Sequence, residues 1–299
     1  MTVKLDIYSA SRRARPLFAA LARLQPRRIS AMLRVHNEEE LLAAALRSIA
    51  DLVDEIVCVD NRSTDRTPEI LRDLAAEYPG KTVVLGYDHA VARVGGETRR
   101  LAETASGRRS PSLSANFYEW CRKRLRHPYA LKWDADMVAL PELADAVRRW
   151  RAGRALGLVF SGANLHSDRR HLAKSRSSDR EALAALLRGV GLPRWVTALE
   201  RDAPEPRLFP RHFVRYTTRI GWTQSPDGPF RDAPSTTGIW QREEAPQFLH
   251  LKFWKRDPYS NYTDDLAAVI AGNLAPGELI PEKWRGALER HELAPREAS

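Results

Sequence analysis

Two aspartates, Asp134 and Asp136, stand two residues apart just downstream of the apolar run from Tyr129 to Leu131. In an extended segment, residues two apart point to the same side, so both carboxylates can face one point in space. Carboxylates held that close repel each other unless a cation or a shared proton relieves them. Ions such as Mg²⁺ take one or two carboxylates and leave their other positions to phosphate oxygens and water. The pair therefore indicates a divalent metal beside a phosphate-bearing ligand, with a solvated surface turn as the alternative.

Two earlier segments have the same form, an apolar run that ends in polar residues. The run from Ile29 to Val35 leads into His36-Asn37-Glu38, and the run from Glu55 to Val59 leads into Asp60. Ligands of parallel α/β sheets bind at the carboxyl ends of the strands. We therefore expect these polar clusters and the two aspartates to meet at one edge of a sheet.

Helical patterns separate these strands. Asn37 is predicted as the N-cap of a helix whose first turn holds Glu38 to Glu40, because that position suits an Asn and acids suit the positive end of a helix. Pro68 stands near the start of the next helix, and Thr82 to Gly86 is a third strand. Alternating strands and helices predict an α/β fold, a mostly parallel sheet flanked by helices, and 299 residues suit a single large domain.

We divide the chain into four parts. Residues 1–28 form a basic amphipathic segment, 29–140 the half that carries the polar clusters, 141–257 a second half of the same domain, and 258–299 a helical tail. The run from Phe248 to Trp254 is expected to be a last strand, with His250 and Lys252 on one side.

The formal charge of +10 favours anionic partners such as nucleotide phosphates, nucleic acid or an anionic membrane face. Only two cysteines are present, and no apolar stretch approaches the ~20 residues of a membrane span. Without a signal-peptide pattern, a cytoplasmic protein is expected. Contact of residues 1–28 with the inner face of the membrane is a further hypothesis, and a helix packed on the domain is its alternative.

Three stretches, in this order, resemble successive motifs of the family 2 glycosyltransferases: 31–39, 59–67 and 133–136. The resemblance covers roughly 29–140. It implies a GT-A fold, a UDP- or GDP-linked sugar as donor, and Mn²⁺ or Mg²⁺ as cofactor.

By position, the resemblance also implies roles for single residues. Those expected to line the nucleotide sugar are Arg34, His36, Asn37, Glu38, Asp60, Arg62, Asp134 and Ala135. Asp134 and Asp136 are expected to hold the metal. His250 is similar to a late-strand histidine that some members place near the metal, and a buried structural histidine is the alternative.

The chain departs from the family at several positions. Arg62 stands where many relatives carry Gly, and Ala115 stands before Asn116 where many carry Arg. Family members are expected to invert the anomeric centre with a carboxylate as base, and Gln224 occupies the place of that acid. Asp227 is the substitute candidate, with Asp232 and Glu243 behind it.

The leading hypothesis is transfer of a sugar to a hydroxyl of a glycan or lipid-linked acceptor, in cell-envelope polysaccharide or glycolipid synthesis. A sugar nucleotidyltransferase is one alternative, although no Gly-rich phosphate loop follows the first strand. A basic nucleic-acid-binding protein is another, but the converging clusters are acidic, so no nucleic acid is expected as a partner. A donor-binding relative without activity is a third.

Overall fold

A seven-stranded sheet, in the order β10-β6-β9-β4-β1-β2-β3, runs through the molecule. This computed structural model describes residues 20, 24–165, 171–175, 205–213, 216, 240–272 and 274–293. The strands are β1 (Ile29–Val35), β2 (Glu55–Asp60), β3 (Thr82–Gly86), β4 (Tyr129–Asp134), β6 (Gly157–Phe160), β9 (Glu205–Pro210) and β10 (Trp240–Arg242). All neighbours pair in parallel except β9, which is antiparallel to β4 and to β6. The prediction of a mostly parallel α/β sheet flanked by helices is confirmed.

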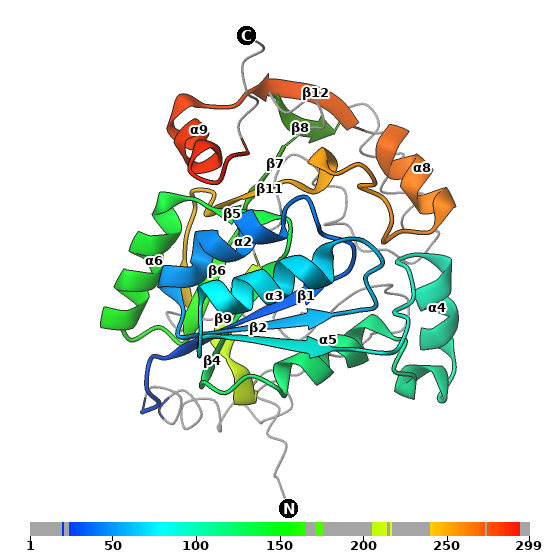
Figure 1. Cartoon of the computed structure of the whole chain (residues 1–299), viewed down its shortest axis with the longest axis horizontal. Helices are drawn as coiled ribbons and strands as arrows, with labels where there is room; N and C mark the ends of the chain where they lie inside the picture. The colour runs from blue at the N-terminus through cyan, green and yellow to red at the C-terminus, as the bar shows by residue number, and fades with distance from the viewer. Residues whose placement is uncertain are drawn as a thin grey trace, which may run out of the picture.

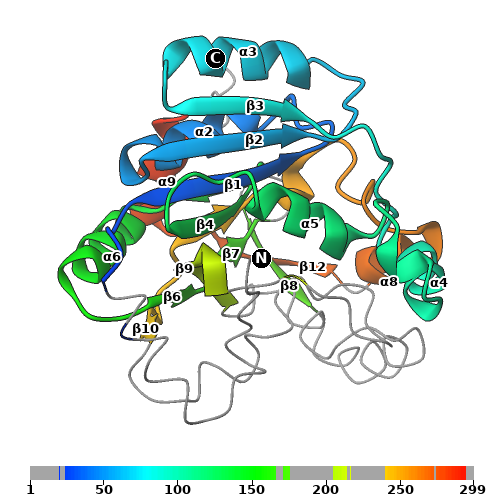
Figure 2. The same cartoon turned by 90° about the horizontal axis from the view of Figure 1, so that it is seen from below.

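Helices cover both faces of this sheet (Figures 1 and 2). On one face, α2 (Leu42–Ile49), α3 (Thr67–Glu77) and α6 (Pro141–Ala152) pack their apolar sides on strand residues such as Leu33 and Leu131. On the other face, α5 (Ser114–Arg122) packs on Met32 and Val57 through Phe117 and Cys121. Because successive strand side chains alternate between faces and both faces are covered, β1, β2 and β4 are apolar almost throughout.

A second sheet of three short strands stands beyond the carboxyl edge of the first. It runs in the order β5-β11-β7, with β5 (Met137–Ala139), β11 (Phe248–His250) and β7 (Ala163–Asn164). Its residues Val138, Leu249 and Ala163 form a buried cluster with α9 (Glu282–Glu289). This small sheet supports the turn between β4 and β5, where Asp134 and Asp136 lie.

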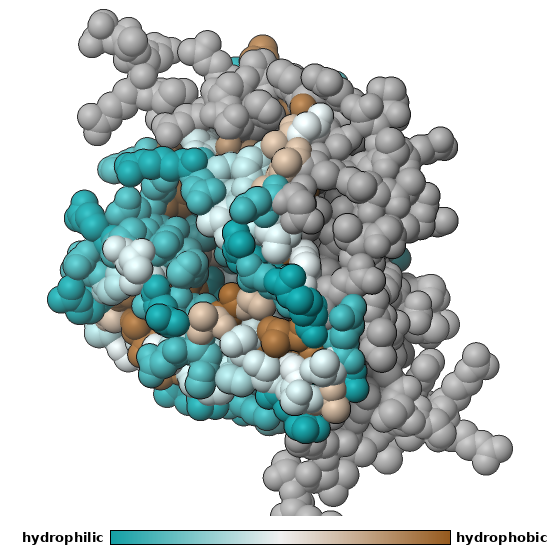
Figure 3. Space-filling view, turned by 90° about the vertical axis from the view of Figure 1, so that its right-hand side faces the viewer, coloured by the Kyte–Doolittle hydropathy of each residue, from teal (hydrophilic) through white to brown (hydrophobic). Residues whose placement is uncertain are grey.

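Shorter elements complete the described chain. These are α4 (Gly96–Glu103), α8 (Asp264–Gly272), the antiparallel pair β8 (His171–Ser175) and β12 (Leu274–Leu279), and 3₁₀ turns at Ala50–Leu52, Gly107–Arg109, Arg211–Phe213 and Lys252–Trp254. On the face that Figure 3 presents, hydrophilic side chains predominate over the described residues, and apolar ones gather only in small groups. No helix of the described residues is long and apolar enough to cross a membrane.

The start of α2 differs from the prediction. The helix begins at Leu42, so Asn37 is not its N-cap and Glu38 to Glu40 precede its first turn. The amides of Leu41 and Leu42 instead donate to the Glu38 carbonyl, at 3.2 and 3.0 Å, and close a separate turn. Asn37 has a positive φ of 54°, which directs the chain away from the strand before that turn.

The strand predicted from Phe248 to Trp254 is also shorter than expected. It ends at His250, where the Leu251 amide donates to the Asp136 carbonyl at 2.8 Å, and a 3₁₀ turn follows at Lys252–Trp254. Lys252 therefore turns away from His250, and its Nζ donates to the Tyr262 hydroxyl. Local alternation could not reveal this change, because a contact with the β4–β5 turn causes it.

The two cysteines, Cys58 and Cys121, are free and buried in the two core layers. Burial raises the pKa of each thiol to about 12. Both side chains therefore serve as small core residues and stay protonated at neutral pH.

Candidate functional site

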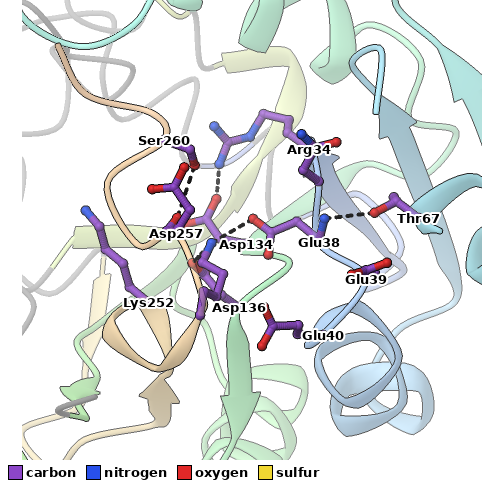
Figure 4. Close-up of polar contacts among 12 residues, drawn as sticks. Arg34, Glu38, Glu39, Glu40, Thr67, Asp134, Asp136, Lys252, Asp257 and Ser260 are labelled. Atoms are coloured by element: carbon purple, nitrogen blue, oxygen red, sulfur yellow. Dashed lines mark hydrogen bonds and ion pairs between the residues drawn. The ribbon is translucent and has the colours of Figure 1, made fainter. Parts of the chain in front are cut away.

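The carboxyl ends of β1, β2 and β4 lie side by side. The register pairs Arg34 with Val59 on one side and with Asp134 on the other, and Val35 with Asp60. Three segments separated in the sequence thus deliver polar side chains to one edge of the sheet. Figure 4 shows Glu38, Asp134 and Asp136 pointing toward one another there.

Asp134, the last residue of β4, is held by two arginines. Arg34 of β1 forms an ion pair with its Oδ1, and Arg207 Nη1 lies 3.6 Å from its Oδ2. The Arg34 guanidinium also stacks on the Tyr118 ring of α5, 3.4 Å from its centroid. Arg207, a residue of β9, is buried, and its Nη2 lies 2.6 Å from Glu205 Oε1. Asp134 is therefore a carboxylate of fixed orientation that remains partly open to solvent.

Asp136 lies in the turn after β4 and has a different set of partners. His250 Nε2 is 3.3 Å from its Oδ1, and Lys255 Nζ is 2.8 Å from its Oδ2. The same ammonium lies 2.8 Å from Glu38 Oε1. The Trp133 indole donates to the Met137 carbonyl at 3.1 Å and fixes the turn between the aspartates. Lys255 thus links Glu38, which follows β1, to Asp136, which follows β4.

Burial and charge shift the protonation of this group. Burial raises the pKa of Glu38 to about 7. The charge of Lys255 opposes this rise, and the charges of Asp136 and Asp134 add to it. Burial acts the same way on Asp136, but Lys255 and His250 outweigh it and hold the pKa of that carboxyl well below its usual range. Burial would lower the pKa of Lys255, and its two carboxylate neighbours raise it instead. Near neutral pH, Asp136 is thus ionised and Lys255 is charged.

The first two clusters are joined by hydrogen bonds that shape the edge. Asn37 Oδ1 accepts from the Thr64 amide at 2.8 Å, and the Asn37 amide donates to Ser63 Oγ at 2.9 Å. The Glu38 amide donates to Thr67 Oγ1 at 2.8 Å. Arg62 has a positive φ of 59°, so the turn adopts at an arginine the conformation that glycine allows most easily. Asn37 thus stabilises this edge by linking the end of β1 to the turn after β2.

The other residues expected on the nucleotide side are spread around the same edge. His36 Nδ1 donates to the Asn61 carbonyl at 2.6 Å, and Asp60 Oδ1 accepts from the Ser63 amide at 3.3 Å. Arg62 is exposed. Ala135 is buried in the same hydrophobic cluster as Leu33 and Leu131.

The candidate base Asp227 and its alternative Asp232 lie outside the described residues, as does Gln224, which occupies the place of the acid of other family members. Glu243 is described, and its carboxylate binds Arg149 of α6 at 2.7 Å and Gln241 at 2.7 Å. These contacts direct Glu243 to α6.

Three residues of this site were not predicted: Lys255, Arg207 and Tyr118. Arg207 could have been predicted, because a buried basic residue in an apolar strand needs an acidic partner. Lys255 and Tyr118 could not, since their partners lie on segments far away in the sequence.

The donor chemistry fits Mn²⁺ or Mg²⁺ in part. Asp136 and His250 adjoin each other and offer a carboxylate and an imidazole, and Asp134 offers a second carboxylate. Within the described ranges, no three His, Cys, Asp or Glu side chains gather into a complete metal site. Asp134, Asp136 and His250 would therefore supply only part of the ligand set of such an ion.

Comparison with known families adds to this geometry. Residues 30–87 match the family model for glycosyl transferase family 2. The resemblance to this family is confirmed over these residues, which include the first two of the three motifs. The matched stretch contains β1, β2, β3 and the first two polar clusters.

Two curated relatives each match 58 residues of the chain. An uncharacterized protein of Mycobacterium tuberculosis is 48% identical over 58 residues, which are 19% of this chain and 13% of that protein. An uncharacterized protein of Mycobacterium bovis matches to the same extent. The chain thus spans about an eighth of the length of these relatives.

Two solved structures with bound UDP are similar to the chain at low identity. Staphylococcus aureus TarS 1–349 with UDP is 13% identical, with 74% of this chain and 60% of that chain covered and a TM-score of 0.42. Glucosyl-3-phosphoglycerate synthase of M. tuberculosis, with Mn²⁺, UDP and glucosyl-3-phosphoglycerate, is 16% identical, with 93% and 84% covered and a TM-score of 0.41.

Proposed function

We propose that the protein transfers a sugar from a UDP- or GDP-linked donor to a hydroxyl of a glycan or lipid-linked acceptor, with Mn²⁺ or Mg²⁺. The observation that carries this proposal is the meeting of Asp134, Asp136 and Glu38 at the carboxyl edge of a family 2 sheet. Such an edge is where α/β proteins bind nucleotides.

In this proposal the nucleotide lies against the ends of β1 and β2. Arg34, Glu38 and Asp60 lie at that edge, and Asp60 is the last residue of β2. The Arg34–Tyr118 stack and the Arg34–Asp134 ion pair hold this edge rigid before the donor arrives. A rigid binding edge lowers the entropy lost on binding.

Asp134, Asp136 and His250 would hold the divalent ion. When bound, the ion would act as a Lewis acid and stabilise the negative charge that develops on the leaving diphosphate. The acceptor oxygen forms a bond to the anomeric carbon, the bond from that carbon to the diphosphate breaks, and the acceptor proton passes to a carboxylate base. Asp227 is our candidate for that base, and inversion of the anomeric centre follows from such a direct displacement.

The acceptor side is a broader proposal. The net charge of +10 suits an anionic glycan or an anionic membrane surface that presents a lipid-linked acceptor. Cell-envelope polysaccharide or glycolipid synthesis provides acceptors of both kinds.

The test is a screen of UDP- and GDP-sugars for release of the nucleoside diphosphate, with Mn²⁺ or with excess EDTA. We expect release from at least one donor only when the ion is present. Asp136→Asn should lower that rate by at least about a hundredfold, because it removes a charge that holds the ion. Glu77→Gln is the matched control, since Glu77 pairs with Arg47 on the surface and should leave the rate unchanged.

Circular dichroism and thermal melting would show that Asp136→Asn is folded. Full activity in EDTA, or full activity of the folded variant, would contradict the metal role. Release of pyrophosphate from a sugar phosphate and a nucleoside triphosphate would instead indicate a sugar nucleotidyltransferase.

A further inference from the structure

Lys255 occupies a position that the proposed reaction does not explain. Its ammonium lies 2.8 Å from Asp136 Oδ2 and 2.8 Å from Glu38 Oε1, and its side chain is only 9% exposed. The backbone on either side is fixed, because Trp254 is buried in the cluster around β11 and the Arg256 amide donates to Glu40 Oε1 at 3.1 Å. The ammonium is thus held on the same carboxylate that is the main candidate for binding the ion.

Basic side chains already pair with both aspartates before an ion enters. Asp134 pairs with Arg34 and Arg207, and Asp136 pairs with Lys255. A divalent ion that enters alone therefore adds two positive charges beside three basic side chains. It must also share Asp136 with an ammonium that already neutralises it.

We propose that Lys255 makes binding of the divalent ion depend on binding of the nucleoside diphosphate. Repulsion from Lys255 weakens binding of the ion alone, since like charges at short range in a poorly solvated site repel strongly. The diphosphate brings negative charge that offsets both the ion and the ammonium. Lys255 thus opposes the ion alone and favours the ion together with the diphosphate, which is a coupling between two ligands.

This inference rests on the proposed function, because it takes Asp136 as a ligand of the ion. It adds that the free protein binds Mn²⁺ poorly and that the ion and the nucleotide enter as a pair. Lys255 acts through Asp136 and is therefore a positioning residue.

The experiment measures free Mn²⁺ by electron paramagnetic resonance during titration of the full chain, with and without UDP. In Lys255→Met, Mn²⁺ alone should bind at least about tenfold more tightly than in the wild type. The factor by which UDP increases the affinity for Mn²⁺ should be at least about tenfold smaller in this variant than in the wild type. Equal or weaker binding of Mn²⁺ alone by the variant would overturn the proposal.

Arg256→Met is the matched control. Arg256 is the next residue, is also basic, and has a side chain that is 82% exposed and lies near Glu39 and Glu40. We expect it to bind Mn²⁺ as the wild type does. If it gained as much affinity as Lys255→Met, the effect would come from net charge, and the role of Lys255 would be refuted.

Lys255→Met leaves two buried carboxylates without their ammonium and can fail to fold. In that case Glu38→Gln is compared with the double variant Glu38→Gln/Lys255→Met, which removes one carboxylate with the ammonium. The double variant should again bind Mn²⁺ at least about tenfold more tightly than the single one, and no difference would overturn the proposal.

These measurements do not read activity, so they separate the two proposals. Coupled binding of Mn²⁺ and UDP without sugar transfer from any donor would contradict the proposed function and leave the coupling intact. Ion-dependent transfer with Mn²⁺ binding unchanged by Lys255→Met would contradict only the coupling.

Discussion

Glu38 shows how one buried acid can serve both structure and binding. Its amide donates to Thr67, its carboxylate pairs with Lys255, and its Oε2 is buried without a hydrogen-bond partner among the residues that the structure describes. A buried carboxylate oxygen without a partner is costly, and a donor group of a ligand can satisfy it. Glu38 is therefore a candidate for direct contact with the nucleotide sugar.

The raised pKa of Glu38 predicts how stability depends on pH. The folded state raises the pKa from 4.5 to about 7, so it binds the Glu38 proton more tightly than the unfolded chain does. The stability contributed by this group is complete below pH 4.5 and is lost as pH rises toward about 7. Glu38→Gln removes the ionisable group, so this variant does not lose stability in this way as pH rises.

Urea unfolding of both proteins at a series of pH values measures the effect. The free energy of unfolding of the wild type, relative to Glu38→Gln, should fall between pH 4.5 and about 7 and then level off. A difference that stays constant or rises across this range would contradict the prediction. Asp136 titrates at lower pH and does not interfere, because its pKa lies well below its usual range.

The small sheet β5-β11-β7 holds His250 beside Asp136. Leu249 is fully buried at its centre, opposite Val138 of β5 and Ala163 of β7. It is followed directly by His250, which binds Asp136. The packing of one short strand thus sets the distance between two candidate metal ligands.

Leu249→Ala should therefore lower the free energy of unfolding by about 2–5 kcal/mol, because it leaves a cavity where three strands meet. Leu279→Ala is the control, since Leu279 lies on β12 with 61% exposure, and its effect should stay within about 0.5 kcal/mol. Urea unfolding measures both. Equal losses in the two variants would show that the small sheet is not part of the cooperative core.

The elements whose pattern is local were predictable from the sequence. β1 to β4 and the helices α2, α3, α5 and α6 follow hydrophobic periodicity, and the motif order indicated that the strand ends share a site. The helix α4 was not predicted, because Gly96–Glu103 has no regular apolar face. What depends on distant contacts was not predictable. Asp136 ends the β11 strand through Leu251, and Lys255 meets Glu38 across 217 residues of chain. The antiparallel direction of β9 likewise follows from its neighbours β4 and β6 and not from its own residues.

The N-terminal segment raises a prediction for the molecule as a whole. Residues 1–19 lie outside the described residues, but Arg27 is placed, with its guanidinium 4.6 Å from the Trp150 ring and bonded to the Ala155 carbonyl at 2.6 Å. A deletion that tests membrane contact should therefore stop at residue 23 and leave Arg27 in place. Removal of Arg27 would disturb the contact with α6.

Co-sedimentation with vesicles that contain anionic lipid compares the full chain with the variant lacking residues 1–23. We expect the full chain to bind and the shortened chain to lose most of that binding, since basic residues near an anionic surface contribute about 1 kcal/mol each. Vesicles of neutral lipid are the control. Equal sedimentation of both chains would contradict a membrane role for this segment.

The position of β1 between β2 and β4 has a consequence for how the chain folds as it is synthesised. β1 can pair with β2, and β2 with β3, once the first 86 residues exist, but the other edge of β1 stays unpaired until β4 is made, a hundred residues further along. Until then that edge presents unpaired backbone groups, which are a template for wrong pairing with other chains. Pairings that join distant segments also form slowly. A nascent chain that stalls before residue 129 therefore lacks the aspartates and keeps an open strand edge, so full-length synthesis protects both its solubility and its chemistry.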